Sequence, residues 1–414
     1  MAAKQGSLFN ASLLVAGTAI GGGMLALPVL TSLGGFLPSI AIYLLSWLFM
    51  TGCGLLFLEV ALACPEDSNL LTMATTTLGP WGRRFCWLLY LFFFYCLTVA
   101  YIVGCGSFVT DLLETATGLA PKTFIGPLLF ITATAPLVVM GTKLVSSVNS
   151  GMMLLLVALY LLFVLLGSSH VEAERLFARE HWGLALLSLP VAFASFGFQG
   201  VVPTLVSYLG RDPKRCRTAI IVGSTLPLFT YLVWQVLILG IVPTFGERGL
   251  VWALANGHDA VKPLRYILQM PYLLLIGQLF AFLALLTSFF GVTLGLTDFL
   301  GDGLAMDHQK VSQRARLALI VFLPPLLVSM VRPDLFLTAL QLAGGFGSAL
   351  LLGLLPIMMV WSGRYGKEGY SSPYRMGGGK LLLIAMMLFI GVELAIECYL
   401  TFHGHMEAFI PKAP

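Results

Sequence analysis

The sequence has few charged residues and no long polar segment. Asp, Glu, Lys and Arg together make up 10% of its 414 residues, whereas 58% are hydrophobic, and the mean hydropathy is +0.93. A soluble globular chain carries about 25% charged residues, so this composition excludes that class. The longest expected loops, about 65–84 and 244–270, are each shorter than thirty residues. They are too short to hold a nucleotide-binding domain, and the sequence indicates a polytopic membrane protein.

The sequence also lacks catalytic and metal-binding motifs. It contains no HExxH, GxSxG or P-loop pattern. The 7 cysteines are scattered, mostly in apolar runs, without CxxC or CxxH spacing. We expect reduced thiols, no disulfide framework, no cofactor and no enzymatic activity. The first apolar run, residues 8–33, is too long for the core of a cleaved signal, so we expect it to remain in the membrane.

Apolar runs of membrane-spanning length recur along the whole chain. A bilayer core of about 30 Å needs about 20 apolar residues per helix. Cutting the sequence at its charged and Pro/Gly-rich interruptions predicts an all-α integral membrane protein with eleven transmembrane helices. The predicted helices are 8–33, 36–64, 85–113, 123–141, 144–168, 184–209, 218–243, 271–300, 315–331, 335–361 and 379–402. With an odd number of helices, the two termini lie on opposite sides of the membrane.

The distribution of Lys and Arg predicts the orientation. Fifteen of the 23 lie on the side of the amino terminus if eleven helices cross the membrane, and the densest cluster is "GRDPKRCR" at 210–217. Cytoplasmic loops retain such residues. We expect a cytoplasmic amino terminus and assign these cations, including Lys143, to topology rather than to substrate binding.

Two of the predicted helices contain glycine-rich interruptions followed by proline. The first carries "VAGTAIGGGMLALPVL" at 15–30 and the sixth carries "SFGFQGVVPTLV" at 195–206. Interrupted helices at corresponding positions of two five-helix halves are typical of transporters built from inverted repeats, with the binding site at the midplane. This predicts a first repeat at 1–168, a second at 184–361 and an additional helix at 379–402.

An interrupted helix offers unpaired main-chain groups to a ligand. The amides of Gly21, Gly22 and Gly23 begin a half-helix and can receive a carboxylate. The carbonyls of the preceding half, including Thr18 and Ala19, can receive an ammonium group. A zwitterionic amino acid fits both ends. The alternative is that these glycines serve only close helix packing.

Four segments resemble one family of transporters. They are "AGTAIGGGMLALP", "YCLTVAYIVG", "SFGFQGVVPTLVSYL" and "LTSFFGVTLGLTDFL". Together they are similar to the hydroxy and aromatic amino acid permeases of the amino acid–polyamine–organocation superfamily, most closely to the tyrosine-specific members. The resemblance implies a leucine-transporter-like five-plus-five inverted repeat with broken helices 1 and 6. It also implies uptake of tyrosine or tryptophan driven by protons across a bacterial inner membrane.

Aromatic residues in the third and sixth predicted helices are candidates for the substrate side chain. Tyr95 and Tyr101 flank Thr98 at i,i+3 spacing. The second interruption adds aromatic rings and one amide. We expect a box formed by Tyr95, Thr98, Tyr101, Phe196, Gly197, Phe198 and Gln199. Ordinary packing is the alternative for each of these rings.

The resemblance also suggests a cation site. In sodium-coupled members of the superfamily, carbonyls of the first span and hydroxyls of the eighth hold the ion. The matching positions here are Gly17, Ile20, Ala284, Thr287 and Ser288, and they offer the neutral oxygens that a hard cation prefers. The hydroxyls can instead satisfy helix carbonyls. We expect no other metal.

A proton-coupled mechanism requires an ionisable group inside the membrane. Glu59, near the end of the second predicted helix, is the candidate, and a side chain reaching the interface is the alternative. Glu393 and Glu397 lie four residues apart on the last helix. Since that helix stands outside the repeat, we expect them to face a neighbouring helix or a partner subunit.

The sequence as a whole predicts a secondary active transporter that imports an aromatic amino acid, tyrosine in the first place, by proton symport and alternating access. Tryptophan selectivity and sodium coupling remain open. A receptor without transport is less favoured because no signalling domain is evident, and a channel because no ring of pore residues is evident. The expected partners are the amino acid, a proton or sodium ion and the lipid bilayer, without nucleic acid.

Overall fold

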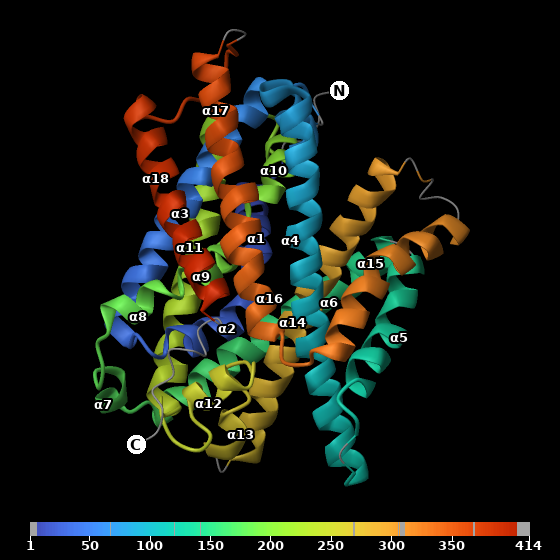
Figure 1. Cartoon of the computed structure of the whole chain (residues 1–414), viewed down its shortest axis with the longest axis vertical. Helices are drawn as coiled ribbons and strands as arrows, with labels where there is room; N and C mark the ends of the chain where they lie inside the picture. Colours follow the sequence, from blue (N-terminus) through green and yellow to red (C-terminus); the bar gives the residue numbers. More distant parts are fainter. Residues whose placement is uncertain are drawn as a thin grey trace.

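A computed structural model describes residues 6–66, 68–119, 121–140, 142–267, 270–304, 306, 311–366 and 369–403. Every regular element in these ranges is a helix (Figure 1). In chain order the elements are α1 (Leu8–Ala19), α2 (Gly22–Thr31), α3 (Phe36–Ala63), α4 (Leu70–Thr117), α5 (Ile125–Met140), α6 (Thr142–Gly167), η1 (Ser168–His170), α7 (Ala173–Leu176), α8 (Trp182–Leu186), α9 (Leu189–Ser195), η2 (Gln199–Val201), α10 (Val202–Tyr208), α11 (Pro213–Ile241), α12 (Leu250–Ala255), α13 (Leu264–Ile267), α14 (Pro271–Gly303), α15 (Val311–Val331), α16 (Phe336–Leu342), η3 (Ala343–Leu354), α17 (Leu355–Tyr365) and α18 (Gly379–Phe402).

The helices have the length and composition of membrane spans. Within the described residues, 9 helices are long and apolar enough to cross a bilayer, and the bent pair α1 and α2 raises the number to 10. The predicted span 123–141 corresponds to α5, which is apolar but has only 16 residues. The prediction of an all-helical, multi-span membrane protein is confirmed. The side chain of Lys143 lies outside the described part of the chain.

One predicted loop is helical. The segment 65–84 was expected to be irregular, but α4 already begins at Leu70, where the Asn69 side chain accepts a hydrogen bond of 2.9 Å from the main-chain N–H of Thr72. Such N-capping satisfies a donor that a helix start otherwise leaves unpaired. The chain changes direction at Gly79 (φ 71°, ψ −160°) and continues as helix. The prediction of a loop there is wrong, because the cap and a single glycine hinge suffice to extend the helix.

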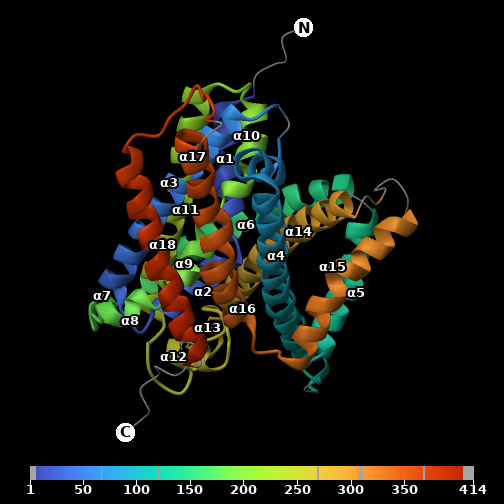
Figure 2. The same ribbon diagram turned by 45° about the horizontal axis from the view of Figure 1, so that its top comes forward.

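The long helices lie side by side around α4, α9 and η3 (Figures 1 and 2). Helices α5 and α15 pack on each other and on α4 at one edge of the molecule, and α18 packs against η3 and α17 on another side. The short helices α7, α8, α12 and α13 gather at one end, towards which α18 runs. Gly6, just before α1, donates to the Tyr208 carbonyl at the end of α10, at the opposite end of the molecule. The described chain therefore begins and ends on opposite faces.

The span Phe336–Tyr365 contains an unusual helix type at its centre. Twelve residues, Ala343–Leu354, form a π-helix, a form that is rare and frequent at functional sites. Gly344 packs against the Pro190 carbonyl of α9, and Gly345 packs against the Glu397 side chain of α18. A Cβ atom at Gly344 would overlap main chain, so that approach requires glycine, whereas one at Gly345 would displace the Glu397 side chain.

Candidate functional site

The first candidate feature is the interruption between α1 and α2. Their axes differ by 53°, and Ile20 and Gly21 between them are extended. A Cβ atom at Gly22 would lie 2.6 Å from Cε1 of Tyr101, and one at Gly21 would overlap the Ser288 hydroxyl. Tyr101 also interacts with Ser288. The glycines thus bring α4 and α14 against bare backbone, whose first-turn N–H groups have no acceptor within the helix.

The second feature is the contact between this interruption and α9. A Cβ atom at Gly23 would lie 3.0 Å from Cα of Ser195, the last residue of α9. The Tyr231 hydroxyl of α11 lies 2.7 Å from the Ala19 carbonyl and 2.8 Å from the Ser195 carbonyl. A phenol has one proton to donate, so the two carbonyls share it. Tyr231 therefore joins the carboxyl-terminal ends of α1 and α9.

Helical hydrogen bonding is interrupted again at residues 196–198, between α9 and η2. The Gln199 side chain fixes this second interruption. Its Oε1 accepts from the N–H of Phe198 at 2.9 Å, and its Nε2 donates to the Met50 carbonyl of α3 at 2.8 Å. The amide that we expected in the substrate box is thus occupied by the main chain and anchors the interruption to α3.

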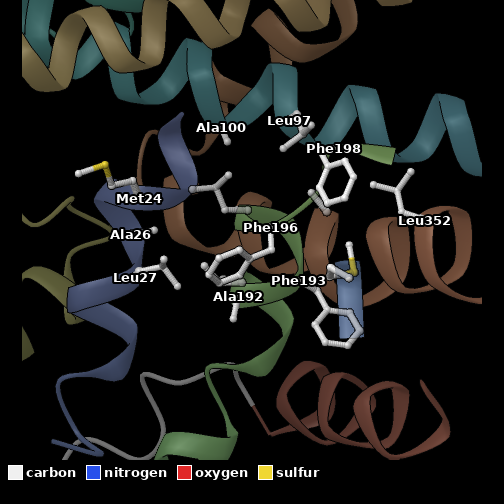
Figure 3. Close-up of a cluster of buried hydrophobic side chains, with 14 of the residues drawn as sticks. Met24, Ala26, Leu27, Leu97, Ala100, Ala192, Phe193, Phe196, Phe198 and Leu352 are labelled. Atoms are coloured by element: carbon white, nitrogen blue, oxygen red, sulfur yellow. The ribbon is translucent and has the colours of Figure 1, made fainter. Parts of the chain in front are cut away.

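The two phenylalanines of the second interruption diverge. Figure 3 shows the Phe196 ring beside Ala192 and the Phe198 ring directed away from it, near Leu97. The Phe196 ring centroid lies 5.1 Å from that of Tyr231. A Cβ atom at Gly54 of α3 would lie 2.6 Å from the Phe198 ring. Only Phe196 therefore packs beside the junction of the two interruptions.

The residues predicted from the third span also face different elements. Tyr101 packs on Gly22, as described above, whereas the Tyr95 hydroxyl donates to the Ile320 carbonyl of α15 at 2.8 Å. Thr98 is buried and donates to the Phe94 carbonyl one turn earlier. The structure brings Tyr101 to the glycine run and directs Tyr95 towards α15.

The predicted cation ligands lie on α1, in the first interruption and on α14. Thr287 donates to the Leu283 carbonyl at 2.8 Å and Ser288 to the Ala284 carbonyl at 2.9 Å, which leaves each hydroxyl its acceptor lone pairs. Ser288 reaches the first interruption, as described above. A Cβ atom at Gly17 would contact Met153 of α6 at 3.4 Å.

Thr18, a predicted substrate residue, lies on the exposed face of α1. Its hydroxyl donates to the Leu14 carbonyl at 2.8 Å. Intrahelical bonding of this kind is common for threonine in membrane helices. In this arrangement the Thr18 side chain faces away from the junction of the interrupted helices, and only its main chain remains near the break.

Glu59 lies in a buried ion pair. Its Oε1 accepts from Nε of Arg364 on α17 at 2.7 Å, and its Oε2 accepts from Nη2 of the same guanidinium. The side chains of Glu59 and Arg364 are 1% and 3% exposed. The N–H of Met376 also donates to Oε2 at 2.9 Å. Removal of either charge would leave its buried partner without a counter-charge, so this arrangement favours a structural role for Glu59.

The segment between α12 and α13 closes over the first half of α2. The N–H of Ala260 donates to the Leu25 carbonyl at 3.1 Å, and Lys262 forms an ion pair with Asp111 of α4. Burial, reinforced by nearby Lys262, lowers the pKa of His258 to about 4. His258 is therefore neutral at physiological pH, and this closure does not depend on its charge.

Sequence reasoning missed two polar connections. One is Tyr231; the other is a buried chain in which Tyr43 donates to Gln235 Oε1 at 2.6 Å and Gln235 Nε2 donates to Thr31 at 2.8 Å. A polar residue inside an apolar span was the available signal for Gln235. No sequence pattern indicated the role of Tyr231, because its hydrogen-bond partners are main-chain carbonyls.

A multi-span helical protein with an interrupted first span, whose break meets a second interruption, has the architecture of a secondary transporter. The comparisons agree with this class. The chain belongs to the tryptophan/tyrosine permease family, whose model matches residues 4–397. Members of this family are permeases rather than enzymes.

Individual relatives cover nearly the whole chain. The tyrosine-specific transport system 1 of Haemophilus influenzae is 33% identical over 92% of this chain and 94% of its own length. The tryptophan-specific transport protein of Pseudomonas aeruginosa is 32% identical over 95% of this chain and 94% of its own. Among solved structures, MhsT in complex with L-phenylalanine matches with a TM-score of 0.62 at 17% identity, covering 96% of this chain and 99% of that one. This likeness supports the leucine-transporter fold.

Proposed function

We propose that this protein imports an aromatic amino acid, tyrosine in the first place, across a bacterial inner membrane by proton symport and alternating access. The observation that carries the proposal is the junction at Gly23, Ser195 and Tyr231, where the two interruptions meet. The names of the relatives support tyrosine or tryptophan as substrate. Proton coupling rests on the family resemblance.

The proposed architecture has eleven spans, with α5 as the fourth. Residues 1–168 and 184–361 form two inverted five-helix repeats, and 379–402 adds a last span. The interruptions at Ile20–Gly21 and at 196–198 are then the broken helices of the two repeats. The excess of Lys and Arg on one side favours a cytoplasmic amino terminus and a periplasmic carboxyl terminus.

In the proposed bound state, the main chain holds the amino acid and Tyr101 and Phe196 contact its ring. The N–H groups of Gly21 to Gly23 receive the carboxylate. The carbonyls that precede the breaks receive the ammonium group. Aromatic contact adds about 0.5–1.5 kcal/mol beyond burial, which favours an aromatic over an aliphatic substrate. Tryptophan is the second candidate, because one relative is named for it.

Labelled tyrosine, tryptophan and leucine, offered to proteoliposomes under imposed proton or sodium gradients, test the proposal. Tyrosine should accumulate against its gradient when the external pH is lower. Preference for leucine would contradict the aromatic site. Binding without counterflow would indicate a receptor instead of a transporter.

Gly22→Val is expected to abolish tyrosine binding without preventing membrane insertion. Its Cβ atom would lie 2.6 Å from Tyr101 and 2.9 Å from Leu285, so the ring must leave the site. Gly197→Val should also impair binding, although its nearest neighbour is a flexible Leu352 methyl at 3.1 Å. Gly291→Val is the matched control, because nothing lies within 4 Å of its Cβ position. Near-normal affinity in Gly22→Val would remove the glycine run from the site.

Replacement of sodium by choline at fixed pH and membrane potential should leave tyrosine uptake unchanged. Dissipation of the proton gradient should abolish accumulation. The sodium alternative predicts the reverse: affinity rises with sodium, because two ligands that favour one conformation strengthen each other equally. In that case Thr287→Val combined with Ser288→Ala would erase the sodium effect. Sodium stimulation that disappears in this double variant would overturn proton coupling.

A further inference from the structure

Two carboxyl groups lie buried on α18, the helix outside the proposed repeats. Glu393 and Glu397 are four residues apart and share one face of the helix. Both are 0% exposed. Acidic side chains inside a membrane helix are costly and usually functional, and the transport site described above does not use these two.

The two carboxyl groups have unequal surroundings. Glu397 Oε2 accepts from the Gln341 amide of α16 at 3.1 Å, and its Oε1 accepts from Thr401 at 3.4 Å. Gly345 of η3 packs directly on its carboxyl. Neither oxygen of Glu393 has a hydrogen-bond partner in the described part of the chain. Glu393 is therefore a fully buried acid with an unused hydrogen-bonding capacity.

No cation compensates the pair among the described residues. Helices α9 and η3, which pack against α18, contain no Asp, Glu, His, Cys, Tyr, Lys or Arg in their sequences. Helix α17 contributes Arg364, which is bound to Glu59, and Tyr365, whose ring lies against Lys380 at the start of α18. The titratable groups that face the carboxyl groups are Cys96 of α4 and Cys398 of α18 itself.

Electrostatics then limits the charge of the pair. An ionised carboxylate without a partner is strongly disfavoured in an apolar interior, and two like charges one helical turn apart disfavour each other further. At least one carboxyl must hold a proton in this conformation. A conformation that hydrates the pair would release it.

We propose that Glu393 and Glu397 form a shared proton-binding site, and that this proton is the one moved in the transport cycle. The proposal rests on the proton symport proposed above. Glu397 is five residues before the end of α18, about 7.5 Å along the helix axis. In the proposed orientation that end faces the periplasm, from which protons enter.

A direct packing route connects this site with the second interruption. Glu397 touches Gly345, and the adjacent Gly344 touches the Pro190 carbonyl of α9. Farther along η3, Ser348 donates to the Phe193 carbonyl of α9 at 3.3 Å. Helix α9 ends at the junction with α2. Loss of the proton would draw water or a cation towards the pair, which requires η3 and α18 to separate. Because α9 is packed on η3, this separation would also act on α9.

The test uses proteoliposomes with Glu393→Gln, Glu397→Gln and the double variant. Glutamine mimics a protonated acid that cannot release its proton. Exchange of internal for external tyrosine, which needs no net proton movement, should stay within about twofold of wild type, whereas accumulation driven by a pH gradient should fall at least about tenfold. Tyrosine-dependent acidification of vesicles loaded with the pH dye pyranine should disappear. Glu174→Gln, which replaces an exposed carboxylate, is the control, and its exchange and accumulation of tyrosine should match those of wild type.

Wild-type accumulation and acidification in the double variant would overturn the proposal. If the wild-type protein moves no protons with tyrosine, the proposed symport is wrong. Proton binding by the pair is then tested by infrared spectroscopy. The infrared C=O band of a protonated carboxylic acid should be present in wild-type protein at neutral pH and weaker in the double variant. Identical bands in both proteins would overturn the proton-binding site whatever the coupling ion.

Discussion

Glu59→Gln is expected to lower the free energy of unfolding by about 3–5 kcal/mol, because it leaves a buried guanidinium unpaired. Arg364 would lose its counter-charge and keep its hydrogen bond to the Met376 carbonyl, at 2.8 Å. In the linker that precedes α18, the Met376 N–H loses its carboxylate acceptor, whereas the Ser372 hydroxyl keeps its bond to the main-chain carbonyl of residue 59. Thermal unfolding in detergent measures the loss.

The matched control is the exposed pair Arg332–Asp334, whose side chains are 60% and 47% exposed. Asp334→Asn should cost about 0–1 kcal/mol. Combining Glu59→Gln with Arg364→Met removes both charges and should recover much of the stability. A stable Glu59→Gln protein that exchanges tyrosine but cannot accumulate it would instead make Glu59 the proton carrier.

Tyr231→Phe is expected to weaken tyrosine binding by about 10–100-fold, equivalent to about 1.4–2.8 kcal/mol. The variant deletes one hydroxyl and leaves the carbonyls of Ala19 and Ser195 without it. A buried acceptor that loses its donor costs about 1–3 kcal/mol. The ends of α1 and α9 would then separate, or a water would enter between them, and the geometry of both interruptions would relax.

Tyr160→Phe is the control for that experiment. Its hydroxyl donates to the Thr230 carbonyl, the residue before Tyr231, at 2.9 Å, so the same type of bond is lost outside the junction. Affinity for labelled tyrosine should be unchanged there. Equal affinities in Tyr231→Phe and wild type would exclude a role of this bond in the binding site.

The sequence predicted the local features of the fold well. Gly21 to Gly23 indicated an interruption, and α1 does end at Ala19; the extended residues are Ile20 and Gly21, while Gly22 and Gly23 already begin α2. The loop at 65–84 was mispredicted, since its charged residues and the Gly79-Pro80 pair predicted an interruption between helices. Threonines can donate to the preceding turn within a helix, as Thr75 does, and the helix persists.

Side-chain partners were less predictable than helices. Tyr95 and Tyr101 are six residues apart, so a helix of 3.6 residues per turn places them about 120° apart. That rotation sends Tyr95 to α15 and Tyr101 to Gly22. Glu59 looked like an isolated acid because its partner is 305 positions away. The isolation of Glu393 likewise depends on packing that no local pattern encodes.

The span Phe336–Tyr365 contacts both buried acid sites. Gly345 touches Glu397, and Arg364, nineteen residues later in the same span, binds Glu59. One span therefore contacts both acid sites, with most of the π-helical stretch Ala343–Leu354 between the two contacts. Any change in the twist or length of that stretch alters the span between them. Such a change would therefore move the contact of Gly345 with Glu397 and the Arg364–Glu59 pair relative to each other.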